Sequence, residues 1–199
     1  ESLVSESGLT GSVGIGHTRW ATHGEPSDLN AHPHTDYSEK FALIHNGIIE
    51  NHSTLKKLLE QKGVEFRTQT DTEVLVQLIS TIYHEEDTTF ETAVTSALEK
   101  VVGTYGIVVM CSDEPNQLIA ARLGSPLVLG VGEGEYFIAS DASPLVEYTR
   151  NVIYLGDREC LFIGDDGYKI KKLGNNKKID KKVSRIDFTL EEIEKGNYP

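Results

Sequence analysis

The sequence predicts an α+β fold built on antiparallel sheets. The predicted helices fall in one block between residues 51 and 101, and eight short apolar segments separated by glycine- and aspartate-bearing turns follow it. Helices and strands that are segregated along the chain are typical of α+β proteins, whereas a doubly wound fold would alternate them. Many short strands joined by turns indicate antiparallel sheets.

Before the helices, the pattern predicts extended and irregular structure. Residues 12–19 alternate apolar and polar side chains, which predicts a strand. Residues 22–35 hold two prolines, a glycine and several polar side chains, which predicts a loop. Residues 41–44 form a short apolar strand that runs into Asn46-Gly47, a dipeptide that often marks a tight turn.

Three helices are predicted next. The leucines of residues 55–59 form an apolar stripe, with Asn51 or Ser53 as the cap and Gly63 at the end. The patterns Thr70-x-x-Glu73 and Thr88-x-x-Glu91 are capping boxes that open two further helices, each with one apolar face.

The remaining elements are strands, followed by a short helix over residues 189–195. The predicted strands cover residues 105–111, 117–123, 127–131, 136–139, 151–155, 159–163, 168–173 and 182–186.

Charge and composition exclude several functions. The 199 residues carry a net charge of −12, which argues against nucleic acid or an anionic membrane as a partner. The seven lysines between residues 169 and 182 are interpreted as a solvated hairpin rim. Cys111 and Cys160 lie in apolar strand-like runs without neighbouring charges that would lower their pKa, so we expect inert core thiols and a reducing cytoplasm.

Two polar stretches follow apolar runs, and such loops often carry binding groups. In residues 16–26, Arg19 matches a carboxylate bidentately, although a lone surface salt bridge is the simpler interpretation. In residues 45–51, Asn46 and Gly47 offer two donors that can meet one oxygen, although an ordinary Asn-Gly turn is the alternative. Asp71, in the first turn of a helix, either binds an ammonium group or only stabilises that helix.

Together with residues 70–74, 124–128 and 137–141, these stretches resemble the glutaminase domain of the glucosamine-6-phosphate synthase family, also called glutamine–fructose-6-phosphate aminotransferases. The resemblance covers nearly the whole chain. It implies a four-layer αββα sandwich, the N-terminal-nucleophile hydrolase fold. It also implies a glutaminase domain over residues 1–186 and a linker over residues 187–199 toward an isomerase region.

The resemblance implies roles for the loop residues. Arg19 would bind the carboxylate of glutamine, and Asp71 its ammonium group. Thr22 and His23 would line the pocket, and Trp20 would help to close it or would simply pack in the core. Asn46 and Gly47 would form the oxyanion hole.

The family's nucleophile is an amino-terminal cysteine whose own α-amine acts as the base, whereas this chain begins with Glu1. We therefore expect the cysteine upstream, and no glutamine hydrolysis by these 199 residues alone. The resemblance further implies ammonia supply for converting fructose 6-phosphate to glucosamine 6-phosphate, no cofactor, a cytoplasmic enzyme and a homodimer.

Five of the seven histidines lie between residues 17 and 45, which raises the question of a metal site. None is paired with a cysteine or carboxylate at ligand spacing, and the family uses no metal for this half-reaction. We interpret His32 and His34 as structural or loop-orienting, and His17 and His45 as packed at strand ends.

Two alternatives stay open. One is the glutaminase domain of another N-terminal-cysteine amidotransferase, serving purine or asparagine synthesis. The other is a non-catalytic amino-acid-binding module. The first residue of the mature domain separates enzyme from binding module, because only an enzyme needs the cysteine there.

Overall fold

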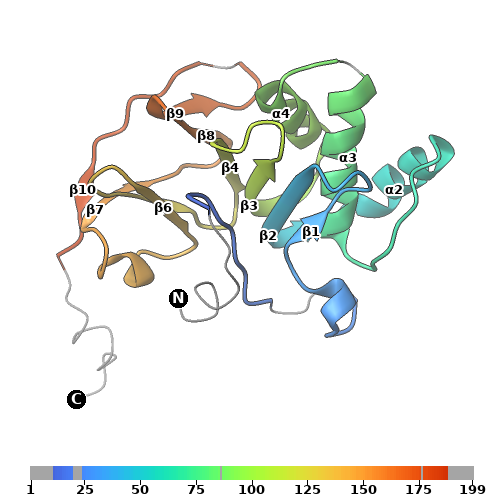
Figure 1. Cartoon of the computed structure of the whole chain (residues 1–199), viewed down its shortest axis with the longest axis horizontal. Helices are drawn as coiled ribbons and strands as arrows, with labels where there is room; N and C mark the ends of the chain where they lie inside the picture. The colour runs from blue at the N-terminus through green and yellow to red at the C-terminus, as the bar shows by residue number, and fades with distance from the viewer. Residues whose placement is uncertain (1–10, 20–23, 86, 176, 188–199) are drawn as a thin grey trace.

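A computed structural model describes residues 11–19, 24–85, 87–175 and 177–187 of the chain. These residues form two antiparallel sheets and three α-helices (Figure 1). No helix among them is both long and apolar enough to cross a bilayer.

The larger sheet has six strands in the order β1-β2-β3-β4-β8-β9, and every neighbouring pair is antiparallel. The strands are β1 (His34–Thr35), β2 (Phe41–Ile49), β3 (Gly103–Cys111), β4 (Leu118–Leu123), β8 (Glu159–Gly164) and β9 (Gly167–Lys172).

The smaller sheet has four strands in the order β10-β7-β5-β6, again all antiparallel. They are β5 (Val128–Val131), β6 (Tyr136–Ala139), β7 (Asn151–Tyr154) and β10 (Ser184–Arg185).

The helices cover one face of the larger sheet, and the smaller sheet lies toward its other face (Figure 1). The helices are α2 (His52–Gln61), α3 (Asp71–Glu85) and α4 (Phe90–Lys100). Alternate strand residues serve the two faces: Ile107 and Val109 belong to the core beneath the helices, and Val108 belongs to the core between the sheets.

A third apolar cluster covers the other side of the smaller sheet. There Leu145, in the 3-10 helix η2 (Ser143–Leu145), packs with Val128 and Val152. In the described part of the chain the layers are therefore helices, sheet, sheet and this short helical turn. The expected α+β class with two packed antiparallel sheets is confirmed.

Three local predictions were wrong. Residues 12–19 have no strand pairing with any described segment. The alternation of apolar and polar side chains indicates a half-buried extended chain, but it does not show that the chain has a hydrogen-bonding partner. Asn46-Gly47 does not end the first long strand, because β3 pairs with β2 as far as Ile49. The cap of α4 is Thr89, whose hydroxyl accepts from the Thr92 N–H, rather than Thr88. The predicted helix over residues 189–195 lies outside the described residues.

Candidate functional site

Strand β2 places consecutive side chains on opposite faces of the larger sheet. Leu43 and Ile49 belong to the core beneath the helices, whereas Ile44 packs against the core between the sheets. Because side chains alternate along a strand, His45 faces the helices and Asn46 faces the other side. The polar stretch at the end of β2 therefore serves two different environments.

Asn46 lines a pocket of about 360 Å³ between the two sheets. The extended segment 16–18 forms one wall, Gly106 lies on the neighbouring strand, and Ile138 and Ser140 come from the end of β6 and just beyond it. A volume of this size is within the range of small-molecule sites.

The amide of Asn46 is held on one side only. Its Oδ1 lies 2.8 Å from Nε2 of His17, and the structure gives its side chain no other hydrogen-bond partner among the described residues. A primary amide has one acceptor oxygen and two N–H donors. The bond to His17 occupies the oxygen, so the donors of Asn46 remain for a pocket ligand.

Gly47 follows Asn46 at a point where no other residue fits without distortion. Its φ is +130°, and a Cβ added there would lie 2.2 Å from the carbonyl oxygen of Thr104 on β3. The backbones of β2 and β3 thus pass in close contact, which fixes the main chain directly beside Asn46.

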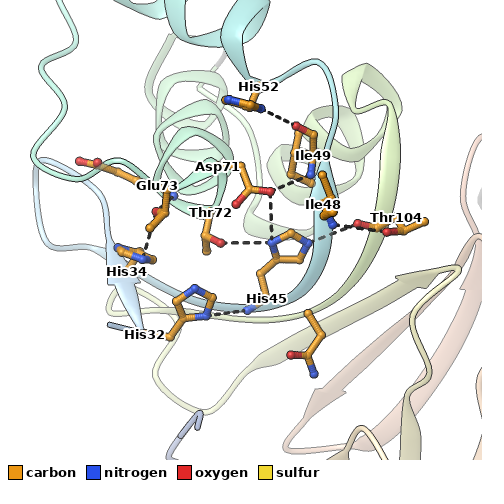
Figure 2. A network of polar contacts seen from close by, with 12 residues as sticks. His32, His34, His45, Ile48, Ile49, His52, Asp71, Thr72, Glu73 and Thr104 are labelled. Atoms are coloured by element: carbon orange, nitrogen blue, oxygen red, sulfur yellow. Dashed lines mark hydrogen bonds and ion pairs between the residues drawn. The ribbon is translucent and has the colours of Figure 1, made fainter. Parts of the chain in front are cut away.

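Asp71 lies on the helix side of β2, at the start of α3 (Figure 2). Its buried Oδ2 accepts from the Ile49 N–H at 2.7 Å and lies 4.0 Å from Nδ1 of His45. That ring also contacts the Thr72 hydroxyl at 3.1 Å and the Thr104 carbonyl at 3.3 Å. A carbonyl can only accept, so Nε2 of His45 carries a proton and donates it to Thr104. This network ties α3 to β2 and β3.

The start of α3 is held by half of the predicted capping box. The Thr70 hydroxyl accepts from the Glu73 N–H at 3.1 Å, as predicted. The Glu73 carboxylate, however, accepts from Arg67 N–H at 2.8 Å and Thr68 N–H at 2.6 Å instead of reaching back to the cap. It therefore fixes the turn that leads to Asp71.

Three imidazoles form a cluster beside the pocket. His17 and His32 stack with ring centroids 4.4 Å apart, and His34 meets His32 edge-on at 4.9 Å. Nδ1 of His32 accepts from the His45 N–H at 3.3 Å (Figure 2). Nε2 of His34 lies 3.1 Å from the Thr70 hydroxyl. Burial, together with the neighbouring histidines, lowers the pKa of His32 to about 3, so this ring is neutral.

Within the residues that the structure describes, no three histidine, cysteine or acidic side chains are grouped to hold a metal ion.

Arg19 lies close to the same cluster. Its guanidinium donates to the carbonyl of Glu25 at 3.0 Å and to that of Gly24 at 3.1 Å. Burial lowers the pKa of His34; the charge of Glu73 opposes this shift, that of Arg19 adds to it, and that of Asp71 opposes it more weakly. Arg19 and Asp71 both influence this imidazole electrostatically, and each is already hydrogen-bonded to backbone groups.

The other predicted pocket residues, Trp20, Thr22 and His23, lie outside the described residues. Sequence reasoning missed the contact between His17 and Asn46 and treated His17 as a packed strand-end residue. No local pattern in the sequence could have found it, because the two residues are 29 positions apart and meet only in the folded chain.

Neither cysteine has the surroundings of a nucleophile. Cys111 and Cys160 are both buried, and neither lines the pocket that contains Asn46. Burial raises the pKa of Cys160 to about 12 and that of Cys111 above its usual value. A thiolate is required for attack, so both thiols are inert.

The sequence profile of the glutamine amidotransferase domain matches residues 17–147, which include Arg19, Asn46, Gly47 and Asp71. The chain belongs to this family. Within it, the chain is similar to the enzymes called glutamine–fructose-6-phosphate aminotransferase (isomerizing).

The relative from Chlorobaculum tepidum is 52% identical over 202 residues, which cover 100% of this chain and 33% of that protein. The relative from Bacteroides thetaiotaomicron is 49% identical over 200 residues, which cover 100% of this chain and 32% of that protein. The chain therefore spans about a third of the length of the curated relatives it matches.

Two solved structures support the fold. One, described as the allosteric regulatory enzyme of purine biosynthesis, is 29% identical with a TM-score of 0.69 over 81% of this chain and 35% of that one. The other, glutamine phosphoribosylpyrophosphate amidotransferase from B. subtilis, is 28% identical with a TM-score of 0.67 over 80% of this chain and 34% of that one. The prediction of an N-terminal-nucleophile hydrolase fold is confirmed by this likeness.

Proposed function

We propose that this chain is the glutamine-hydrolysing part of an enzyme that converts fructose 6-phosphate to glucosamine 6-phosphate. The observation that carries the proposal is the Asn46-Gly47 pair, in which one amide is oriented by His17 at a pocket and the next residue is fixed by Thr104. The similarity to the aminotransferases extends over the entire chain.

The chemistry requires an oxyanion hole and two clamps. A thiolate attacks the side-chain amide of glutamine, and the amide of Asn46 and the N–H of Gly47 stabilise the oxyanion that develops. Arg19 holds the α-carboxylate, which accepts more strongly than the two neutral carbonyls that now bind the guanidinium. Asp71 holds the ammonium group, since a carboxylate has more acceptor sites than the one that Ile49 uses. Trp20, Thr22 and His23 complete the pocket.

The ammonia is used by a sugar-phosphate isomerase region of the same polypeptide. That region accounts for the length of the relatives that this chain does not cover. The enzyme is a cytoplasmic homodimer, and its glutaminase half needs no cofactor.

The test is an assay of the full-length protein with glutamine and fructose 6-phosphate, in which glutamate and glucosamine 6-phosphate are measured together. Equal formation of both products supports the proposal. The likeness to purine-synthesis enzymes favours a second candidate function, an amidotransferase of purine synthesis. Glutamate formation that is stimulated by phosphoribosylpyrophosphate but not by fructose 6-phosphate would support this second function. Glutamine binding without glutamate formation would indicate a binding module.

The clamps are tested through the Michaelis constant. We expect Asp71→Asn to raise KM for glutamine because it removes the charge that pairs with the ammonium group, and Arg19→Lys to do the same because lysine offers no planar fork. Measuring KM together with the melting temperature separates clamping from a structural role. If Asp71→Asn lowers the melting temperature and leaves KM unchanged, Asp71 only supports its helix, a contribution of about 0.3–1 kcal/mol.

The 199-residue chain by itself should release no ammonia from glutamine, because both of its thiols are buried with raised pKa values. In the full-length protein, Cys111→Ser and Cys160→Ser should leave glutaminase activity unchanged. Ammonia release by the bare chain that disappears with Cys111→Ser would show that this thiol is a nucleophile after all.

A further inference from the structure

We propose that His17 is a positioning residue for Asn46: its Nε2–H donates to Oδ1 of Asn46 and thereby turns the two amide N–H donors toward the pocket. This inference rests on the proposed function of Asn46 as an oxyanion donor. His17 itself contacts no reacting atom and acts only through Asn46.

The physical need for such a residue follows from the amide itself. The terminal torsion of an asparagine side chain is broad and roughly two-fold, so the oxygen and nitrogen exchange places at little cost. The side chain of Asn46 is exposed, and no described residue other than His17 forms a hydrogen bond to it. In the flipped orientation the amide oxygen would face the developing oxyanion. The partial negative charge of this oxygen would repel the negative charge of the oxyanion. The bond at 2.8 Å selects the catalytically useful orientation.

The tautomer of His17 agrees with this role. Its Nδ1 is buried and has no hydrogen-bond partner among the described residues. A proton on Nδ1 would create a buried, unsatisfied donor, which is costly. The proton therefore belongs on Nε2, the atom that faces the acceptor oxygen of Asn46.

The ring of His17 is held in place, through His32, by the backbone of β2. It stacks on His32 at 4.4 Å with 30° between the ring planes, and Nδ1 of His32 accepts from the His45 N–H. Two stacked imidazoles thus connect the backbone of His45 to the side chain of Asn46, the next residue along β2. Because His32 is neutral, the stack adds no charge that would repel a protonated neighbour or attract the amide oxygen.

The experiment compares His17→Gln with His17→Asn in the full-length protein. The amide nitrogen of glutamine reaches the place of Nε2, whereas that of asparagine reaches only the place of Nδ1. Both variants carry a polar amide in place of the imidazole and differ only in side-chain length. We expect His17→Asn to lower kcat for glutamine hydrolysis by about 10-fold or more, with little change in KM. The loss should not exceed the roughly 10²–10³-fold effect of removing the Asn46 donor itself. His17→Gln should retain most of kcat.

A double-mutant cycle with Asn46→Ala separates positioning of Asn46 from a general structural role. It compares the effect of His17→Asn on kcat in the parent enzyme and in the Asn46→Ala variant. If His17 acts through Asn46, His17→Asn should have no further effect on kcat in the Asn46→Ala background. An equal loss of kcat in both backgrounds would overturn the proposal, and so would equal impairment by the two substitutions of His17. A parent enzyme that forms no glutamate would instead refute the function of the site, and this outcome is distinct from both.

Discussion

Replacing Asn46 with alanine should lower kcat for glutamine hydrolysis by about 10²–10³-fold, the usual loss for one oxyanion donor. The amide faces the pocket and its oxygen is occupied by His17, so its donors are free to face the pocket, where we propose that the negative charge develops. These donors act mainly in the transition state, so KM should change much less than kcat. Steady-state glutaminase kinetics on the full-length protein measure both constants.

Asn51 provides the matched control for this substitution. It is the asparagine that caps α2, and its side chain links the Lys100 carbonyl at 2.9 Å to the Val102 N–H at 2.9 Å, far from any pocket role. Asn51→Ala should lower the melting temperature and leave kcat intact. If Asn46→Ala folds normally and keeps its kcat, Asn46 is not an oxyanion donor.

Most helices and strands could be predicted from the sequence because they depend on residues that are close together in the chain. The capping hydroxyl of Thr70 begins a helix through a bond three residues away, and the apolar spacing along residues 71–85 predicted that helix. The spacing did not show that every residue from Asp71 to Ser80 is buried, because burial on all sides depends on the neighbouring elements. The strands from β3 to β9 were equally visible, since each has its own apolar run and turn.

The end of β2 could not be predicted in the same way. Asn46-Gly47 is a turn signal when it is read alone. In the folded chain, Gly103–Tyr105 of β3 pair with residues 47–49, and this long-range pairing overrides the local preference of the dipeptide. The same close pairing explains why position 47 needs glycine: a Cβ there would collide with the Thr104 carbonyl of β3, and no turn is involved.

The site shows a similar division. The sequence pointed to Arg19, Asn46, Gly47 and Asp71. The structure places Asn46 at the pocket between the sheets and Asp71 on the helix side of β2, and Arg19 bonds to the loop carbonyls of Gly24 and Glu25; the catalytic roles of all four remain predictions. It could not show that His17 contacts Asn46, because the two residues are 29 positions apart and meet only through the packing of an unpaired segment. Contacts of this kind depend on tertiary structure and leave no periodic signal.

Gly47→Ala should destabilise the chain by about 4 kcal/mol or more, an exceptional loss for which overpacking and backbone strain are two of the known causes. The backbone φ of +130° disfavours any residue with a Cβ, and the new Cβ would lie 2.2 Å from the oxygen and 2.7 Å from the carbon of the Thr104 carbonyl. These are main-chain atoms of the neighbouring strand, so relief requires β2 and β3 to separate. Urea unfolding of the chain, followed by circular dichroism, measures the loss.

Gly63→Ala is the control that separates conformational strain from collision. Gly63 also has a positive φ, +86°, but an added Cβ would have no atom within 4 Å. Its substitution should therefore cost only the left-handed backbone penalty of about 1–2 kcal/mol. Equal losses for the two variants would mean that the contact with Thr104 relaxes freely. A larger loss at Gly47, with glutaminase activity reduced even where the protein stays folded, would show that the spacing between β2 and β3 also sets the position of the oxyanion donors.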